Sequence, residues 1–148
     1  TRLFRTIERF ANAGVTCGVN IDPIMPLVTD SNQELDAIIQ ACRLAGVKHI
    51  FGSMLRLRTD IWHRMKMVFA LLGRKDAAEQ YMKIYGFKEP LSGNYLVCDK
   101  RYGERVLDRI RSMALEANIS NDFPQHMRSG SICKLHSGQQ SILNYTTH

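Results

Sequence analysis

The chain has 148 residues, a length that one domain with a single hydrophobic core can account for. Its apolar fraction of 45% and charged fraction of 23% exclude a disordered or fibrous protein. The formal charge of +6 favours an anionic partner, such as nucleic acid or a phosphorylated ligand. The alternative is that the charge serves only to keep the protein soluble. No apolar run reaches the roughly 18 residues of a membrane span, and no leader-like segment is visible, so we expect a cytoplasmic protein.

Two copies of one supersecondary unit fill the first 60 positions. Each is an amphipathic helix, an Ala-Gly-Val break and an apolar strand. The breaks at residues 13–15 and 45–47 are 32 positions apart, which suits one βα unit of about 30 residues. Their glycines, Gly14 and Gly46, are predicted to end the helices in the left-handed conformation. The first helix carries an apolar stripe of Leu3, Ile7 and Phe10.

The second helix has a clear start signal. Ser31 and Glu34 have the spacing of a capping box, with Asp30 and Asn32 as competing caps. Strands are expected at residues 15–21 and 49–55, on either side of this helix, and therefore as parallel neighbours. The stripe expected to pack on them is Leu35, Ile38, Ile39, Cys42 and Ala45.

The second half is mostly helical by its pattern. Residues 59–73 predict a helix capped by Thr59, and residues 75–86 and 103–119 predict two more. Residues 94–98 fit either a short strand or a buried loop. From Ser120 onward, turn-forming and polar residues predict an extended or flexible tail. For residues 59–73 the expected apolar side is Ile61, Met65, Val68 and Leu72, ended by Gly73.

Charged residues and prolines gather where the two strands should end. Asp22 and Pro23 follow the first strand, with Pro26 close behind, and Arg56 and Arg58 follow the second. Pro23 is expected to end the strand pairing, because proline has no N–H to donate. Ligands of parallel α/β sheets bind beyond the carboxyl ends of the strands, so this rim is a candidate site. The alternative is that the prolines simply end a strand and the arginines are solvated.

The segments Ala-Gly-Val, "DPIMPLVTD", Glu34-Leu35, the second Ala-Gly-Val and "MLRL" occur in this order. In that order they resemble the second half of radical S-adenosylmethionine enzymes of the spore photoproduct lyase-like group, which are described as DNA-repair photolyase-like proteins. The resemblance covers residues 2 to 58 well and the later helices more weakly, to about residue 124.

The resemblance implies an incomplete (β/α) barrel that binds S-adenosylmethionine and a 4Fe-4S cluster in the intact enzyme. Residues 1–119 would be its C-terminal part, followed by the tail at residues 120–148. The strands would be the fifth and sixth of the barrel. The residues implied to face the cofactor or substrate are Asn20, Asp22 and Pro23 from one strand and Met54 and Arg56 from the next.

The chain departs from the family in one respect. The family holds its cluster with a CxxxCxxC loop, and this spacing is absent from the 148 residues. We therefore expect a piece of a larger lyase-like enzyme that is inactive alone and binds neither cofactor by itself. P-loop, dinucleotide-binding and nucleophile-elbow motifs are also absent.

The cysteines suggest one further site. Cys17 and Cys42 fall in apolar runs and are expected to be buried, and four scattered cysteines predict no disulfide framework. Cys133 and His136 have a metal-ligand spacing, and His126 and Cys98 could complete a zinc site, although a tail without metal is the alternative.

Two hypotheses from different classes remain open. The first is the C-terminal portion of a radical S-adenosylmethionine enzyme, and nucleic acid is one substrate considered for the intact enzyme. The second is a non-catalytic α/β module whose basic surface binds nucleic acid or a protein partner. A partial barrel would also expose a sheet edge and an uncovered apolar face, so we expect the isolated fragment to self-associate.

Overall fold

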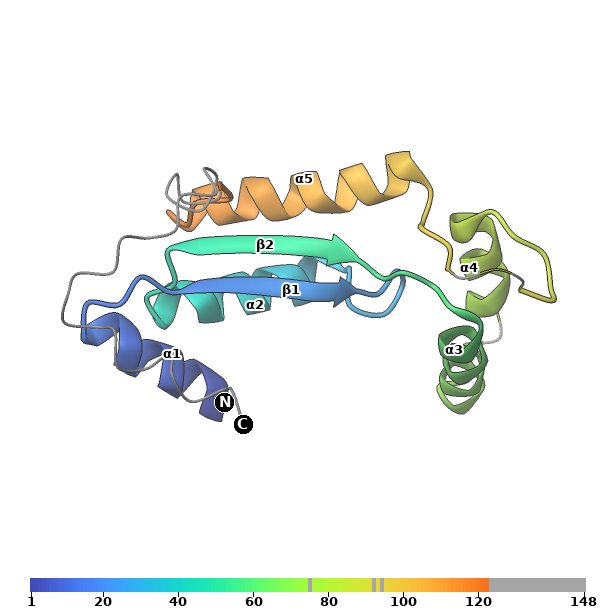
Figure 1. Ribbon diagram of the computed structural model, residues 1–148, viewed down its shortest axis with the longest axis horizontal. Helices are drawn as coiled ribbons and strands as arrows, with labels where there is room; N and C mark the ends of the chain where they lie inside the picture. The colour runs from blue at the N-terminus through green and yellow to red at the C-terminus, as the bar shows by residue number, and fades with distance from the viewer. Residues whose placement is uncertain (75, 92, 94, 123–148) are drawn as a thin grey trace, which may run out of the picture.

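A pair of parallel strands lies at the centre of the fold (Figure 1). The computed structural model describes residues 1–74, 76–91, 93 and 95–122. Within them the chain forms five helices and a two-stranded parallel sheet, a mixed α/β architecture. In order, the elements are α1 (Arg2–Asn12), β1 (Gly18–Ile24), α2 (Asn32–Leu44), β2 (His49–Met54), α3 (Thr59–Leu71), α4 (Ala77–Tyr85) and α5 (Lys100–Glu116).

The βα unit forms as its sequence predicts. β1 and β2 are parallel neighbours, with Gly18 opposite His49, and α2 connects them. The hydroxyl of Ser31 accepts a hydrogen bond from the Glu34 N–H at 3.2 Å and donates one to the Glu34 carboxylate at 2.7 Å, which confirms the predicted helix start. Gly46 follows α2 with a φ of 78°, a conformation that costs glycine little.

The first strand is longer at its carboxyl end than expected. β1 runs on to Ile24, so the prediction that Pro23 ends the pairing is wrong. The register shifts between Ile21 and Ile24, which lie opposite Gly52 and Met54, so β1 holds one extra residue there. This irregularity accommodates the cis Asp22–Pro23 peptide, and pairing resumes when the Ile24 carbonyl accepts the Leu55 N–H at 2.9 Å.

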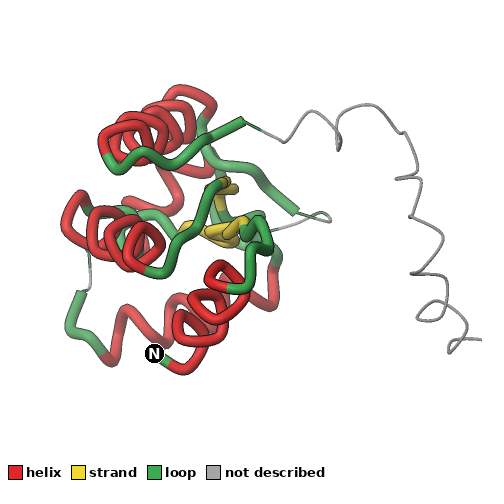
Figure 2. Tube along the Cα trace, turned by 90° about the vertical axis from the view of Figure 1, so that its left-hand side faces the viewer, coloured by secondary structure: helices red, strands yellow, loops and turns green. Residues whose placement is uncertain are grey.

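The larger of two cores lies between the sheet and the helices α2 and α5. Ile24 and Ile50 meet Leu35 and Ile39 of α2 and Ile110 of α5, and each of these five side chains is at most 1% exposed. Burying an aliphatic side chain of this size contributes roughly 1.5–3 kcal/mol. In Figure 2, which looks along the strands, helices border the strand pair on one side and loops lie on the other.

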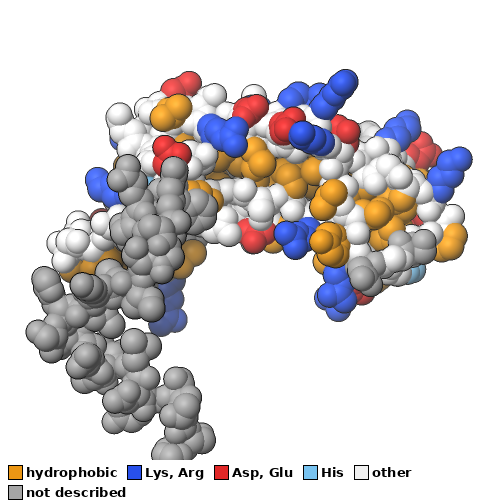
Figure 3. Space-filling view, turned by 45° about the horizontal axis from the view of Figure 1, so that its top comes forward, with side chains coloured by type: hydrophobic (Ala, Val, Ile, Leu, Met, Phe, Trp, Pro, Cys, Tyr) orange, Lys and Arg blue, Asp and Glu red, His pale blue; other side chains and the backbone are white. Residues whose placement is uncertain are grey.

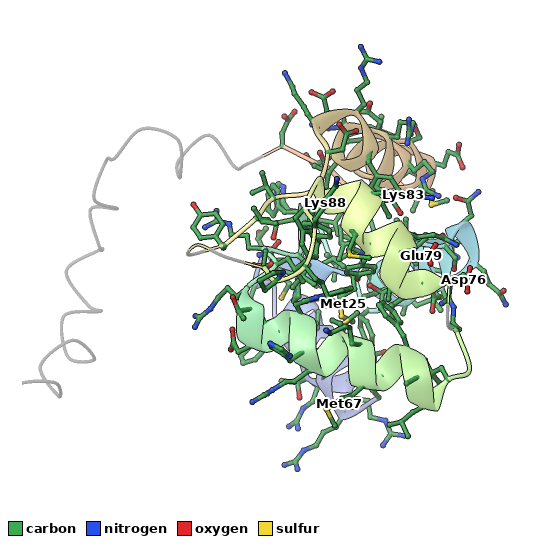
Figure 4. All side chains as sticks on the ribbon, turned by 90° about the vertical axis from the view of Figure 1, so that its right-hand side faces the viewer. Met25, Met67, Asp76, Glu79, Lys83 and Lys88 are labelled. Atoms are coloured by element: carbon green, nitrogen blue, oxygen red, sulfur yellow. The ribbon has the colours of Figure 1, made fainter. Side chains whose placement is uncertain are left out.

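A second core forms beyond the carboxyl ends of the strands, at the right of Figure 1. There α3 and α4 pack together, and Trp62 and Phe69 of α3 meet Tyr81 and Tyr85 of α4. Figure 4 shows Met25, from the loop after β1, lying between these two helices. The partly buried Met54 contacts both cores and so connects them.

The buried side of α3 matches the predicted one only in part. Met65 is buried and Ile61 is half-buried, as predicted, but Val68 and Leu72 are 40% and 60% exposed. Trp62 and Phe69 are buried in their place. Because the helix is apolar on two sides, its own pattern does not determine which side packs. The aromatic residues of α4 select the Trp62 side.

After α5, which starts at Lys100 with Asp99 as its cap, the chain returns to the sheet. Ser120 donates its N–H to Lys48 at 3.0 Å and accepts from Ile50 at 2.9 Å, a parallel bridge on the far edge of β2. The segment expected as a short strand or buried loop makes one antiparallel bridge, between Leu57 and Leu96. Within the described residues, no helix has both the length and the apolar character that a membrane crossing requires.

Candidate functional site at the strand ends

The exposed face of the sheet carries the first of the predicted cofactor-facing residues. Asn20 and Asp22 are exposed on β1, while their neighbours Val19 and Ile21 are half-buried toward the helices. Asn20 lies opposite Phe51 in the strand register. Both line a cavity of about 360 Å³, which Leu107, Ile110 and Arg111 of α5 and Asn121 close from the side.

Asp22, Pro23 and Arg56 share the carboxyl end of the sheet. Asp22 and Pro23 immediately precede Ile24, and Arg56 follows Leu55, the residue that is hydrogen-bonded to Ile24. All three are exposed. The parallel pairing thus places the acidic and basic groups on one rim, although no ion pair joins them within the described residues.

Met54 does not join this group. Its Cγ lies 3.5 Å from where a Cβ on Gly103 of α5 would stand, and its side chain packs on both cores. Met54 therefore faces the helices, on the opposite side of the sheet from Asn20. Its role in the structure is to hold the second core against the strand ends.

The loop at residues 95–97 builds the outer wall of the rim. The Leu57–Leu96 bridge has two backbone hydrogen bonds of 2.8 Å, which hold Tyr95 beside the end of β2. The Arg56 guanidinium lies 5.4 Å from the centre of the Tyr95 ring. Such a cation–π contact orients an exposed arginine while leaving its N–H groups available.

A cavity of about 820 Å³ adjoins this wall at the amino end of α3. The Arg58 Nε is 3.2 Å from the Asp60 carboxylate, and both side chains are well exposed. The cap residue of α3, Arg58, makes no side-chain hydrogen bond to the first turn, so the N–H groups of this turn lack a capping side-chain acceptor. The remaining wall is formed by Thr59, His63, Gly93 and Tyr95.

A smaller cavity of about 340 Å³ continues along the polar side of α3, and shares Thr59 and His63 with the first. At its far end Glu89 accepts a hydrogen bond from the Trp62 indole N–H at 2.8 Å and another from Lys66. The hydrogen bonds from Lys66 and then Trp62 hold the pKa of Glu89 below its usual value, so this carboxylate stays ionised. It is a partner for Lys66 rather than a general acid.

The chemistry available at this rim is binding. Arginine and uncapped helix N–H groups bind carboxylate or phosphate, and Asp22 and Asn20 could accept or donate hydrogen bonds to hydroxyl groups. Within the described residues, no group of three or more His, Cys, Asp or Glu side chains could hold a metal ion. Three of the residues predicted as a zinc site, His126, Cys133 and His136, lie outside the described residues.

The described cysteines are separate from the rim and from one another. Cys42 is fully buried in the larger core, as predicted, and burial raises the pKa of its thiol to about 11. Cys17 is only half-buried, before β1. Cys98 is buried with its Sγ 3.2 Å from where a Gly103 Cβ would stand, and burial raises the pKa of its thiol.

A buried polar connection that the sequence does not predict lies behind the rim. Asp30, a candidate helix cap by its sequence position, is 8% exposed and accepts hydrogen bonds from the Leu27 N–H at 2.8 Å and the Tyr102 hydroxyl at 2.5 Å. Arg109 donates to the Asp30 carbonyl at 3.0 Å and to Asn32 at 2.6 Å. These bonds hold the loop after β1 against α5, and no local spacing signals them.

In comparisons with known proteins, no protein-family model, no curated protein and no solved structure matches the chain.

Proposed function

We propose that the chain is the C-terminal part of a (β/α) barrel enzyme of the radical S-adenosylmethionine class, related to the spore photoproduct lyase-like group. The observation that carries the proposal is that Asp22 and Arg56, which belong to the resembling segments, lie at the same end of a parallel strand pair. The parallel bridge of Ser120 with the free edge of β2 is further support, because a barrel adds its next parallel strand at such an edge.

The described residues do not fit an iron–sulfur cluster. Cys42 is enclosed by core side chains, and Cys17 and Cys98 lie on different elements. In this proposal the chain contributes binding and orientation only. Arg56 would hold an anionic group of the bound molecule, and Asn20 and Asp22 would hydrogen-bond its hydroxyl groups.

The test uses the complete reading frame that encodes this chain. After anaerobic reconstitution with iron and sulfide, we expect bound iron and the release of 5′-deoxyadenosine from S-adenosylmethionine under reduction. Arg56→Gln should lower this release at least tenfold, since a charge-assisted contact is lost. Arg5→Gln on α1 removes the same charge away from the rim and should have no effect. A reading frame that binds neither iron nor S-adenosylmethionine would refute the proposal.

A second candidate function is a non-catalytic binding module with a basic surface. The observation in its favour is the pairing of Arg56 with an exposed aromatic ring, Tyr95, an arrangement that suits nucleic-acid bases and phosphates. A concentrated basic patch is not visible on the face that Figure 3 shows, where Lys and Arg side chains are spread out and interleaved with acidic ones. If the module binds DNA, Arg58→Gln and Lys66→Gln should each make the slope of log K against log[salt] shallower by about one, since each removes one phosphate contact.

Self-association of the isolated chain is expected if it is a fragment of a barrel. α1 has no buried residue, and Leu3 and Phe10 are 66% and 53% exposed. The outer edge of β1 has no strand partner within the described residues. Sedimentation should show dimers or larger species, which Leu3→Glu and Phe10→Glu weaken. A clean monomer at high concentration would contradict this.

A further inference from the structure

A second cavity, of about 740 Å³, lies on the outer side of α5 where this helix meets the start of α2. Its wall includes Arg105, Arg109 and Ser112, which stand at helical spacings of four and three on one side of α5, and Asn32 of α2. It is formed by different residues from those at the strand-end rim.

One of the two arginines is held in place by the protein. Arg109 donates from one terminal nitrogen to the Asn32 side chain at 2.6 Å and from the other to the Asp30 carbonyl at 3.0 Å. Neither acceptor is a carboxylate, so the positive charge of Arg109 is oriented but not neutralised. An arginine fixed in this way loses little conformational freedom when it binds an anion.

The other arginine has a position but no carboxylate partner. Arg105 lies 5.7 Å from the centre of the Tyr102 ring, and within the described part of the chain no salt bridge involves it. Tyr102 is itself fixed, since its hydroxyl donates to the buried Asp30. Asp108 also lines the cavity, but it is paired with Arg111 at 2.5 Å.

We propose that this cavity binds a phosphate dianion, either inorganic phosphate or a phosphate monoester, between Arg105 and Arg109. Two guanidinium groups from one wall, one helical turn apart, match the double charge and the several acceptor oxygens of phosphate, and the Ser112 hydroxyl adds a neutral donor one turn along α5. Glu116, the remaining acidic residue of the wall, stands two turns from Arg109 along the helix. Glu116 is thus separate from the two arginines, and Asp108, which stands between them along α5, is paired with Arg111.

The test is a titration of the ¹⁵N-labelled chain with sodium phosphate, against sodium chloride at matched ionic strength. We expect saturable shifts of the Arg105 and Arg109 Nε–H signals and of the Ser112 amide with phosphate alone, and the same shifts with phenyl phosphate if monoesters are accepted. Arg105→Gln should weaken binding about tenfold or more, and Ser112→Ala, which changes no charge, several-fold.

Arg5→Gln on α1 is the matched control, because it removes one exposed positive charge elsewhere and should leave binding unchanged. Shifts that do not saturate, or that chloride reproduces, would overturn the proposal. So would equal weakening by Arg5→Gln and Arg105→Gln, which would indicate general charge attraction. Binding of a DNA oligonucleotide without binding of phosphate would also overturn it. None of these results depends on the proposed enzymatic function, since no turnover is measured.

Discussion

The Tyr102 hydroxyl donates a 2.5 Å hydrogen bond to the carboxylate of Asp30, 72 positions away in the sequence. The bond joins the first turn of α5 to the loop that follows β1. Because Asp30 is buried and its other oxygen accepts the Leu27 N–H, this loop has a fixed conformation next to the strand-end rim.

Removing this hydroxyl should destabilise the fold. We expect Tyr102→Phe to lower the free energy of unfolding by about 2 kcal/mol, since hydrogen bonds to charged groups contribute roughly 1.5–3 kcal/mol. Urea unfolding followed by circular dichroism measures it. Asp108→Asn, which breaks an exposed pair with Arg111 on the same helix, should cost less than about 0.5 kcal/mol. Equal losses of stability in the two variants would show that the buried hydrogen bond stabilises the fold no more than the exposed ion pair does.

Two neighbouring tyrosines of α4 should respond in opposite ways to loss of their hydroxyls. Tyr85 donates to the Leu55 carbonyl at 2.8 Å in a buried position, so Tyr85→Phe should cost about 1–2 kcal/mol. The buried Tyr81 hydroxyl has no hydrogen-bond partner among the described residues. Tyr81→Phe should therefore be neutral or stabilising by up to about 1 kcal/mol. A loss of stability at Tyr81 similar to that at Tyr85 would mean that the Tyr81 hydroxyl is bonded in solution.

Alkaline pH should destabilise the protein through the same side chains. Burial, as the first cause, raises the pKa of Tyr81, Tyr85 and Tyr102 above the ordinary value of about 10. Above pH 10 the unfolded chain releases these protons while the folded chain keeps them, so stability falls as pH rises. The slope approaches about 1.4 kcal/mol per pH unit for each tyrosine. Urea unfolding between pH 8 and 11 measures this slope. Tyr102→Phe should make the slope shallower by the contribution of one tyrosine.

The two glycines of the Ala-Gly-Val breaks should differ when replaced by alanine. Both have a positive φ, 81° at Gly14 and 78° at Gly46, which costs alanine about 1–2 kcal/mol. A Cβ at Gly46 would also stand 2.9 Å from the Ala11 Cβ of α1, whereas one at Gly14 would meet nothing within 4 Å. Gly46→Ala should thus be the more destabilising by at least about 1 kcal/mol in urea unfolding. Equal costs would mean that α1 moves aside freely.

Replacements on α3 should identify its buried side. Phe69 is 1% exposed, and Phe69→Ala should cost about 3–5 kcal/mol. Leu72 is 60% exposed and Leu72→Ser should stay within about 0.5 kcal/mol. Met67, which Figure 4 shows on the outer side of α3, should tolerate Met67→Gln in the same way. Thermal unfolding of the three variants distinguishes this packing from the one predicted by sequence pattern.

The amino-acid sequence by itself determined the local elements. The capping box at Ser31, the apolar stripe of α2 and the glycine after it are signals within one turn or one helix, so α2 could be placed from them. The parallel pairing of β1 and β2 followed, because a crossover helix leaves few other arrangements. For the same reason Asp22 and Arg56 could be expected at one end of the sheet.

Only the tertiary structure decided the remaining features. α3 has two apolar sides, and contact with Tyr81 and Tyr85 determines which one is buried. The sequence does not show which side of β2 Met54 occupies. In the structure it packs toward α5, where Gly103, which has no side chain, leaves room for it. The Asp30–Tyr102 and Arg109–Asn32 bonds join residues more than 70 positions apart. Such contacts depend on where whole elements pack, and a repeat or spacing within a single element carries no information about that.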